Sequence, residues 1–175
     1  DWIFHVAAVA DYWRADQAHM MDVNVEGTRR VLQAARENGV KRVVFTSSGA
    51  AVGFIKERPA NETDAFNLPP GRFPYGYSKA LAEAVVTEAV QAGQDVVTVN
   101  PVVVLGPGDL NVISGDFVLK IKRLQWTIPV TPGGVAVVDV RDVARMHLAA
   151  ATQGRTGERY ILGTANYKYA DWMRM

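Results

Sequence analysis

The sequence predicts an α/β fold, in which helices cover both faces of a doubly wound, mostly parallel sheet. Short apolar runs alternate along the chain with segments whose apolar residues recur at helical spacing, and this alternation is typical of strand–helix–strand crossover units. Polar clusters follow two of the apolar runs, at strand ends where such sheets bind their ligands. The length of 175 residues fits one domain with a buried core.

The first predicted strand and helix lie within residues 2–39. The short run "WIFHVAA" (2–8) has the apolar character of a strand that is covered on both faces. The segment 16–39 is predicted to be helical, because its small and apolar residues recur at helical spacing and a glycine follows them. These residues are Val25, Thr28, Leu32, Ala35 and Gly39.

A second strand and helix flank a long irregular segment. The run "KRVVFTSS" (41–48) predicts a buried strand that ends in hydroxyl side chains. Residues 49–74 contain four prolines and are predicted to be irregular. A helix is expected over about 75–92, and Gly93 ends it.

The second half of the chain continues the alternation. The run "DVVTVNPVVV" predicts a strand that leads into the turn "LGPGD". The predicted strands are 95–104, 134–140 and 157–163, of which the third is the last in the chain. The predicted helices are 112–125 and 141–152.

The composition argues against several classes of function. Nineteen Lys and Arg residues against eighteen Asp and Glu residues leave a net charge of +1 without a basic stripe, which argues against nucleic-acid and membrane-surface binding. The chain has no cysteine and only three scattered histidines, so neither a disulfide nor a metal site is predicted. No apolar run approaches the ~20 residues that cross a bilayer.

Tyr75 and Lys79 form the first candidate for chemistry. They are four residues apart in the predicted helix, so their side chains project from one face. A free tyrosine has a pKa near ~10, and a neighbouring ammonium lowers that pKa, which makes the phenol a usable proton donor and acceptor. Ser47 and Ser48 end the preceding strand and can point toward the same crevice. Ordinary packing is the alternative, because Tyr-x-x-x-Lys occurs by chance on many helices.

Six motifs occur in an order that resembles the extended short-chain dehydrogenases/reductases, the NAD-dependent epimerase/dehydratase family. The resemblance extends from "DWIFHVAA" to "GERYILG", nearly the whole chain. The motifs are "HVAA", "NVEGTRRVLQAA", "RVVFTSS", "YGYSK", "NPVVVLGPG" and "VVDVRDVARMHLAA". The resemblance implies a Rossmann-like fold and a nicotinamide cofactor, NAD or NADP.

The resemblance also implies a catalytic set. Tyr75 would be the acid/base, and Lys79 would hold the nicotinamide ribose and lower the pKa of the tyrosine. Ser48 would polarise the substrate oxygen, with Ser47 as the alternative because the two serines are adjacent.

Cofactor-binding residues follow from the same resemblance. Ala7 and Ala8 would line the adenosine side of the cofactor, and Asn24 would brace the central strands near it. Pro101, Val102 and Val103 would lie against the nicotinamide. No metal ligand is implied.

The chain departs from the family pattern at its start. It begins inside an apolar strand pattern without a start methionine, and the Gly-rich phosphate loop is absent. We therefore expect a fragment of a longer protein whose N-terminal strands are missing. Residues 1–105 would be the C-terminal portion of the NAD(P)-binding domain with the catalytic residues. Residues 106–175 would combine a small substrate-binding part with the remaining sheet elements, without forming an independent domain.

The favoured reaction is NAD(P)-dependent interconversion of a ketone or aldehyde and an alcohol. Asn100 and Val52 stand where sugar-nucleotide epimerases of this family usually have Arg and Tyr, and "NPVVVLGPG" is similar to the dihydroflavonol-reductase-like branch. The alternatives are epimerisation or dehydration of a nucleotide sugar, and a catalytically inactive fragment or binding module. The expected partner is the small-molecule substrate, with a homodimer as a possible assembly and a cytoplasmic location.

Overall fold

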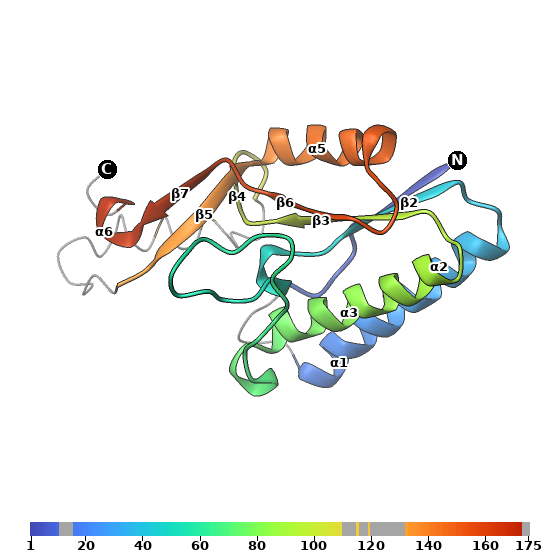
Figure 1. Ribbon diagram of the computed structural model, residues 1–175, viewed down its shortest axis with the longest axis horizontal. Coiled ribbons are helices and arrows are strands. Elements are labelled where there is room, and N and C mark those ends of the chain that lie inside the picture. The colour runs from blue at the N-terminus through green and yellow to red at the C-terminus, as the bar shows by residue number, and fades with distance from the viewer. Residues whose placement is uncertain (11–15, 110–114, 116–118, 120–131, 173–175) are drawn as a thin grey trace.

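A four-stranded parallel sheet forms the centre of the computed structural model, which describes residues 1–10, 16–109, 115, 119 and 132–172. Its strands lie in the order β1-β2-β3-β6, and each neighbouring pair is parallel. They are β1 (Trp2–His5), β2 (Arg42–Thr46), β3 (Val96–Pro101) and β6 (Arg159–Leu162). Together with the helices on both faces (Figure 1), this sheet confirms the predicted α/β fold.

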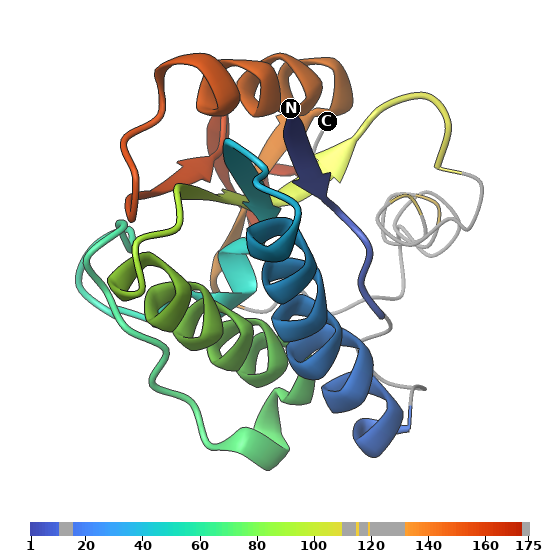
Figure 2. The same ribbon diagram turned by 90° about the vertical axis from the view of Figure 1, so that its right-hand side faces the viewer.

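One face of the sheet is covered by a helical layer from two segments of the chain. In the first segment, α1 (Gln17–Met21), the π-helical turn η1 (Asp22–Glu26) and α2 (Gly27–Glu37) follow one another directly. The second is α3 (Pro74–Gln91), which lies beside α2 (Figure 2). Gly39 and Gly93 follow α2 and α3 with φ angles of 62° and 90°, a conformation that ends helices and favours glycine.

The opposite face is covered by α5 (Val140–Gln153), so the sheet separates two apolar clusters. Because side chains alternate along a strand, Val43 and Phe45 of β2 pack with α2 and α3, whereas Val44 packs with α5. The near-continuous apolar runs in the sequence reflect this burial on both faces.

A second, three-stranded sheet corrects one predicted element. It contains β4 (Val103–Leu105), β5 (Gly134–Asp139) and β7 (Ala165–Lys168), with β4 parallel and β7 antiparallel to β5. The single strand predicted over 95–104 was therefore wrong, because the chain divides into β3 and β4 at Val102. Pro101 has no N–H group to continue the ladder, and β3 ends there.

The end of the chain also differs from the prediction. The strand predicted over 157–163 is not the last, because β7 follows β6 and α6 (Tyr169–Trp172) follows β7. The segment 49–74, predicted to be irregular, contains two short 3₁₀ turns, η2 (Gly49–Ala51) and η3 (Pro70–Arg72). Apart from residues 115 and 119, the helix predicted over 112–125 falls outside the described residues.

Candidate active site

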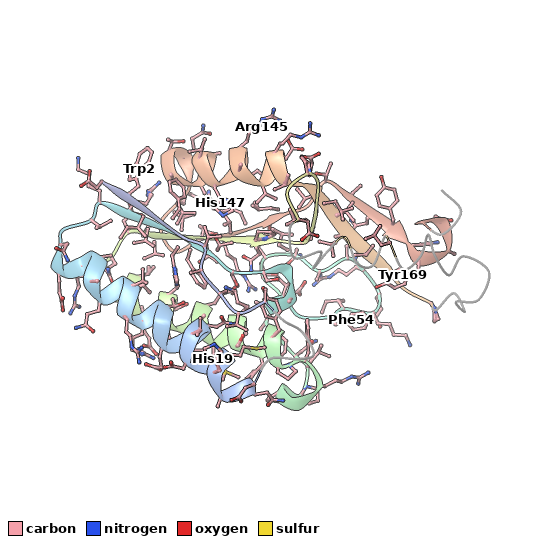
Figure 3. All side chains as sticks on the ribbon, turned by 180° about the vertical axis from the view of Figure 1, so that it is seen from behind. Trp2, His19, Phe54, Arg145, His147 and Tyr169 are labelled. Atoms are coloured by element: carbon pink, nitrogen blue, oxygen red, sulfur yellow. The ribbon has the colours of Figure 1, made fainter. Side chains whose placement is uncertain are left out.

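A cleft of about 380 Å³ lies beyond the carboxyl ends of β2 and β3, where parallel sheets usually bind ligands. Its walls come from the ends of these strands, from the segment after β1, from the start of α3, from β4 and the loop after it, and from α5. Figure 3 shows His147 between α5 and the sheet. The residues that line it at the strand ends and at the start of α3 are Thr46, Ser47, Ser48, Tyr75, Pro101 and Val102.

Tyr75 and Ser48 meet at this cleft because the start of α3 packs closely on the turn η2. Pro74 is the first residue of α3, and Tyr75 follows it with 6% of its surface exposed. Its ring lies 6.3 Å from that of Phe73. A Cβ atom at Gly76 would lie 2.5 Å from Ala50 O, so only glycine allows this approach of the helix to the turn.

The two adjacent serines have different hydrogen-bond partners. Ser47 donates its hydroxyl proton to the carboxylate of Glu83. Ser48 Oγ accepts the Ala50 N–H at 3.1 Å as the cap of η2, so its own proton remains available to donate. This difference favours Ser48 over Ser47 as the group that contacts a substrate oxygen.

Lys79 lies one helical turn after Tyr75 and is almost fully buried, with 2% of its surface exposed. Its Nζ donates to Thr46 O at 2.7 Å and lies 4.8 Å from the centre of the Phe45 ring. Burial lowers the pKa of Lys79 to about 8, and the nearby Glu83 carboxylate opposes that shift. An ammonium has three N–H donors, of which Thr46 O takes one, so this group fits a further acceptor such as a ribose hydroxyl.

Asn24 joins the segment after β1 to the start of α3. The residue is 1% exposed, and its side chain accepts from Val9 N at 2.8 Å and donates to Val9 O at 3.0 Å. It also donates to Ser78 Oγ at 2.9 Å, and Ser78 in turn donates to Tyr75 O at 2.7 Å. Asn24 belongs to the π-helical turn η1, and such turns often occur at functional sites.

The remaining predicted cofactor residues lie in two places. Pro101 and Val102 line the cleft, whereas Val103 begins β4 and does not line it. Ala7 and Ala8 follow β1 outside the cleft, and Ala7 is exposed. The structure therefore brings Ser47, Ser48, Tyr75, Pro101 and Val102 together in the cleft, whereas Lys79, Asn24, Ala7, Ala8 and Val103 do not line it.

Glu83 and Arg159 form part of the surroundings of the site and were not predicted from the sequence. Arg159 Nη1 donates to Glu83 Oε2 at 2.8 Å. Glu83 lies four residues after Lys79, so the helical spacing that identified Lys79 could also have identified Glu83. The bond from Ser47 depends on the packing of α3 on β2, which spacing along the chain does not reveal.

The described residues contain no cluster of three or more His, Asp or Glu side chains that could hold a metal ion. None of the helices in the described ranges is long and apolar enough to cross a membrane.

Comparison with known sequences supports the resemblance. The model of the NAD dependent epimerase/dehydratase family matches residues 1–163. A putative dihydroflavonol 4-reductase from Synechocystis is 39% identical over 171 residues, covering 94% of this chain and 49% of that protein. The chain spans about half the length of the curated relatives that it matches.

Solved structures share the fold. The crystal structure of gox2253 matches with a TM-score of 0.85 and 35% identity, over 99% of this chain and 53% of that chain. DesIV, a dTDP-glucose 4,6-dehydratase from Streptomyces venezuelae solved as a double mutant with NAD, matches with a TM-score of 0.84 and 26% identity, over 99% of this chain and 55% of that one. Since the family model covers most of its length, the chain belongs to the NAD dependent epimerase/dehydratase family.

Proposed function

We propose that the full-length protein is an NAD(P)-dependent oxidoreductase that interconverts a ketone or aldehyde and the corresponding alcohol. One observation carries the proposal: Ser48 and Tyr75 line one cleft at the carboxyl ends of parallel strands, and the buried ammonium of Lys79 lies one turn after Tyr75. A phenol, a hydroxyl and an ammonium in this arrangement suit proton transfer at an alcohol or carbonyl oxygen.

Each side chain has a separate role in the proposed reaction. Tyr75 donates a proton to the carbonyl oxygen during reduction and accepts it from the alcohol during oxidation. Ser48 donates a hydrogen bond to the same oxygen, which stabilises the negative charge that develops there. Lys79 supplies a positive charge that favours the ionised phenol.

A nicotinamide cofactor, NAD or NADP, would supply or accept the hydride. The residues around the cleft fit such a group. Lys79 retains N–H donors for a ribose hydroxyl, and Pro101 and Val102 provide an apolar wall for a planar ring. Ala7 and Ala8 would border the adenosine side, held in place through the bonds of Asn24 to Val9.

The choice of a reductase rests on sequence similarity. The relative from Synechocystis carries the name of a reductase and is 39% identical. A nucleotide-sugar dehydratase or epimerase is the second candidate, because DesIV, a dTDP-glucose 4,6-dehydratase, shares the fold at 26% identity. A reductase would oxidise one nicotinamide cofactor for each substrate molecule that it reduces, so the nicotinamide absorbance would change. A nucleotide-sugar epimerase or dehydratase would convert its substrate without net change in that absorbance.

The proposal predicts that Tyr75→Phe removes proton transfer but keeps the ring. Turnover of the full-length protein, measured by nicotinamide absorbance against a panel of ketones, aldehydes and alcohols, should fall about 10²–10⁴-fold. The Kd for the cofactor, measured by calorimetry, should change little.

Tyr77→Phe is the matched control for that experiment. Tyr77 lies on the same helix, and its ring packs near Phe66 with 6.1 Å between the ring centres. We expect the Tyr77 variant to keep normal turnover. Near-normal turnover by Tyr75→Phe would show that Tyr75 is a packing residue.

A further inference from the structure

We infer that Glu83 is a positioning residue for the site proposed above, and that its carboxylate fixes the turn carrying Ser48 relative to Lys79. The inference rests on the proposed function, since it assigns a role within the same reaction. Glu83 does not line the cleft, so its role would be exerted through its neighbours and not through contact with substrate.

The carboxylate of Glu83 accepts hydrogen bonds from residues in or next to three strands. Ser47 Oγ, just after β2, donates to Oε1, and Asn100 Nδ2 of β3 donates to the same oxygen at 2.6 Å. Arg159 Nη1 of β6 donates to Oε2 at 2.8 Å. With 14% of the Glu83 side chain exposed, these bonds are shielded from water and stronger than surface ones.

Two of these donors determine where Ser48 lies. Ser47 immediately precedes Ser48, and its side chain is held by Glu83. The Asn100 amide nitrogen that bonds Glu83 also donates to Ser48 O at 2.9 Å. The backbone of Ser48 is therefore fixed on both sides by groups that Glu83 holds.

The orientation of Asn100 shows that these bonds come at an energetic cost. Its Nδ2 atom lies beside two acceptors, Ser48 O and Glu83 Oε1. A flipped amide would instead place Oδ1 beside these two oxygens, where it could not donate a hydrogen bond. In the observed orientation Asn100 Oδ1 is buried without a hydrogen-bond partner among the described residues. An unpaired buried acceptor destabilises a fold, and such exceptions are expected where the structure serves a functional site.

Glu83 is also linked to Lys79 by charge. The two residues are four apart on α3, and the carboxylate favours the ammonium, while burial lowers the pKa of Lys79 to about 8. Burial and, to a smaller extent, the charge of Lys79 lower the pKa of His5 of β1. Arg159 forms an ion pair with Glu83. Further titratable groups among the described residues of this region are Tyr75, one turn before Lys79, His147, which bonds Thr46 Oγ1, and Asp64, whose carboxylate lies near Arg159.

Arg159 extends the same network to the loop before α3. Its Nε donates to Glu62 O at 2.6 Å, and its Nη2 donates to Asp64 O at 2.7 Å. A separate cavity of about 580 Å³ lies here, lined by Glu62, Glu83 and Arg159 but by none of Ser48, Tyr75 and Lys79. Glu83 thus supports the proposed site from the side away from the cleft.

The test is Glu83→Gln in the full-length protein. A glutamine keeps the shape, but its amide nitrogen cannot accept the bonds that the second carboxylate oxygen accepts. We expect turnover to fall about 10–100-fold, since displacements near 1 Å at a reacting centre cost about that much. The alkaline limb of the pH profile of turnover should move to lower pH, because Lys79 loses the charge that favours its ammonium.

Glu88→Gln is the matched control, since Glu88 lies on the same helix and forms an exposed ion pair with Arg29 at 2.9 Å. If Glu83→Gln gave the turnover and pH profile of Glu88→Gln, the inference would be overturned while the proposed function remained. If the full-length protein bound neither NAD nor NADP, both would fall.

Ser47→Ala keeps the inference testable if Glu83→Gln does not fold. It removes a single donor to Glu83 and adds no charge. We expect turnover to fall about fivefold, the equivalent of one hydrogen bond, with an unchanged Kd for the cofactor. Unchanged turnover would overturn the inference.

Discussion

His5 is a buried histidine that connects β1 to the residues around Asn24. Its Nε2 lies 3.0 Å from Thr28 Oγ1, and Thr28 donates its own proton to Asn24 O at 2.7 Å. Thr28 Oγ1 must therefore accept from His5, which places the proton of the neutral ring on Nε2. Burial and, to a smaller extent, the charge of Lys79 lower the pKa of His5 below its usual value.

This lowered pKa predicts a pH-dependent loss of stability. In the unfolded chain the pKa of His5 is about 6.5. As pH falls from above this value toward the lower pKa of the folded protein, the unfolded chain binds a proton on His5 that the folded protein does not bind. The stability that neutral His5 contributes above this pH range is therefore lost. The melting temperature of the His5→Gln variant should therefore fall less between about pH 7.5 and about pH 5.5 than that of the wild type. His19→Gln, at an exposed position on α1 (Figure 3), should behave as the wild type does. Equal losses in all three proteins would contradict the prediction.

Residues differ in how far the sequence could reveal their roles. Tyr75 and Lys79 were found because helical geometry fixes which positions share a face. The preference for Ser48 over Ser47 came from family resemblance, and the bond from Ser47 to Glu83 supports it independently. That bond and the one from Arg159 join elements far apart in the chain, so they depend on packing that no local pattern encodes.

At the scale of elements, the close approach of α3 to η2 brings Tyr75 near Ser48. Gly76→Ala would place a Cβ atom 2.5 Å from Ala50 O and within 2.9 Å of two ring atoms of Phe73. A backbone oxygen cannot move as a flexible side chain can, so α3 must shift. We expect the free energy of unfolding, measured with urea, to fall by about 1–3 kcal/mol.

Gly71→Ala separates this steric effect from the general effect of replacing glycine. Gly71 lies in η3, and a Cβ atom there would meet nothing within 4 Å. The free energy of unfolding of the Gly71→Ala variant should stay within about 0.5 kcal/mol of the wild-type value or rise slightly. The packing argument fails if Gly76→Ala is as stable as Gly71→Ala.

Most elements fall in the predicted ranges, including the four-residue strands β1 and β6, whereas the division between β3 and β4 and the strand β7 were not predicted. The ends of β2 and α3 lie within one or two residues of the predicted ends. An apolar run or several turns of helical periodicity give a strong local signal. The split between β3 and β4 was missed, since both halves are apolar and only Pro101 and Val102 separate them. β7 was missed because its residues, "ANYK", contain no apolar run like those of the equally short β1 and β6.

At the scale of the whole molecule, the arrangement leaves β1 at one edge of the main sheet. Among the described residues β1 pairs with β2 alone. Trp2 and Phe4 of this strand expose 47% and 38% of their surfaces, and Val6, which follows the strand and lines the cleft, exposes 58%. Proteins usually protect edge strands with charges, prolines or covering segments, and β1 has neither a charged residue nor a proline.

We therefore expect a polypeptide of residues 1–175 to self-associate through β1, because its unpaired backbone groups and exposed apolar side chains can join those of a second copy. Light scattering after size exclusion should show a mass that rises with concentration. Trp2→Lys should shift this rise to about tenfold higher concentration, equivalent to about 1.4 kcal/mol of association free energy. Phe54→Lys is the control, since Phe54 is 68% exposed but lies well away from Trp2 (Figure 3). If the polypeptide stayed monomeric, or if both lysine variants acted alike, this edge would not be the surface of association.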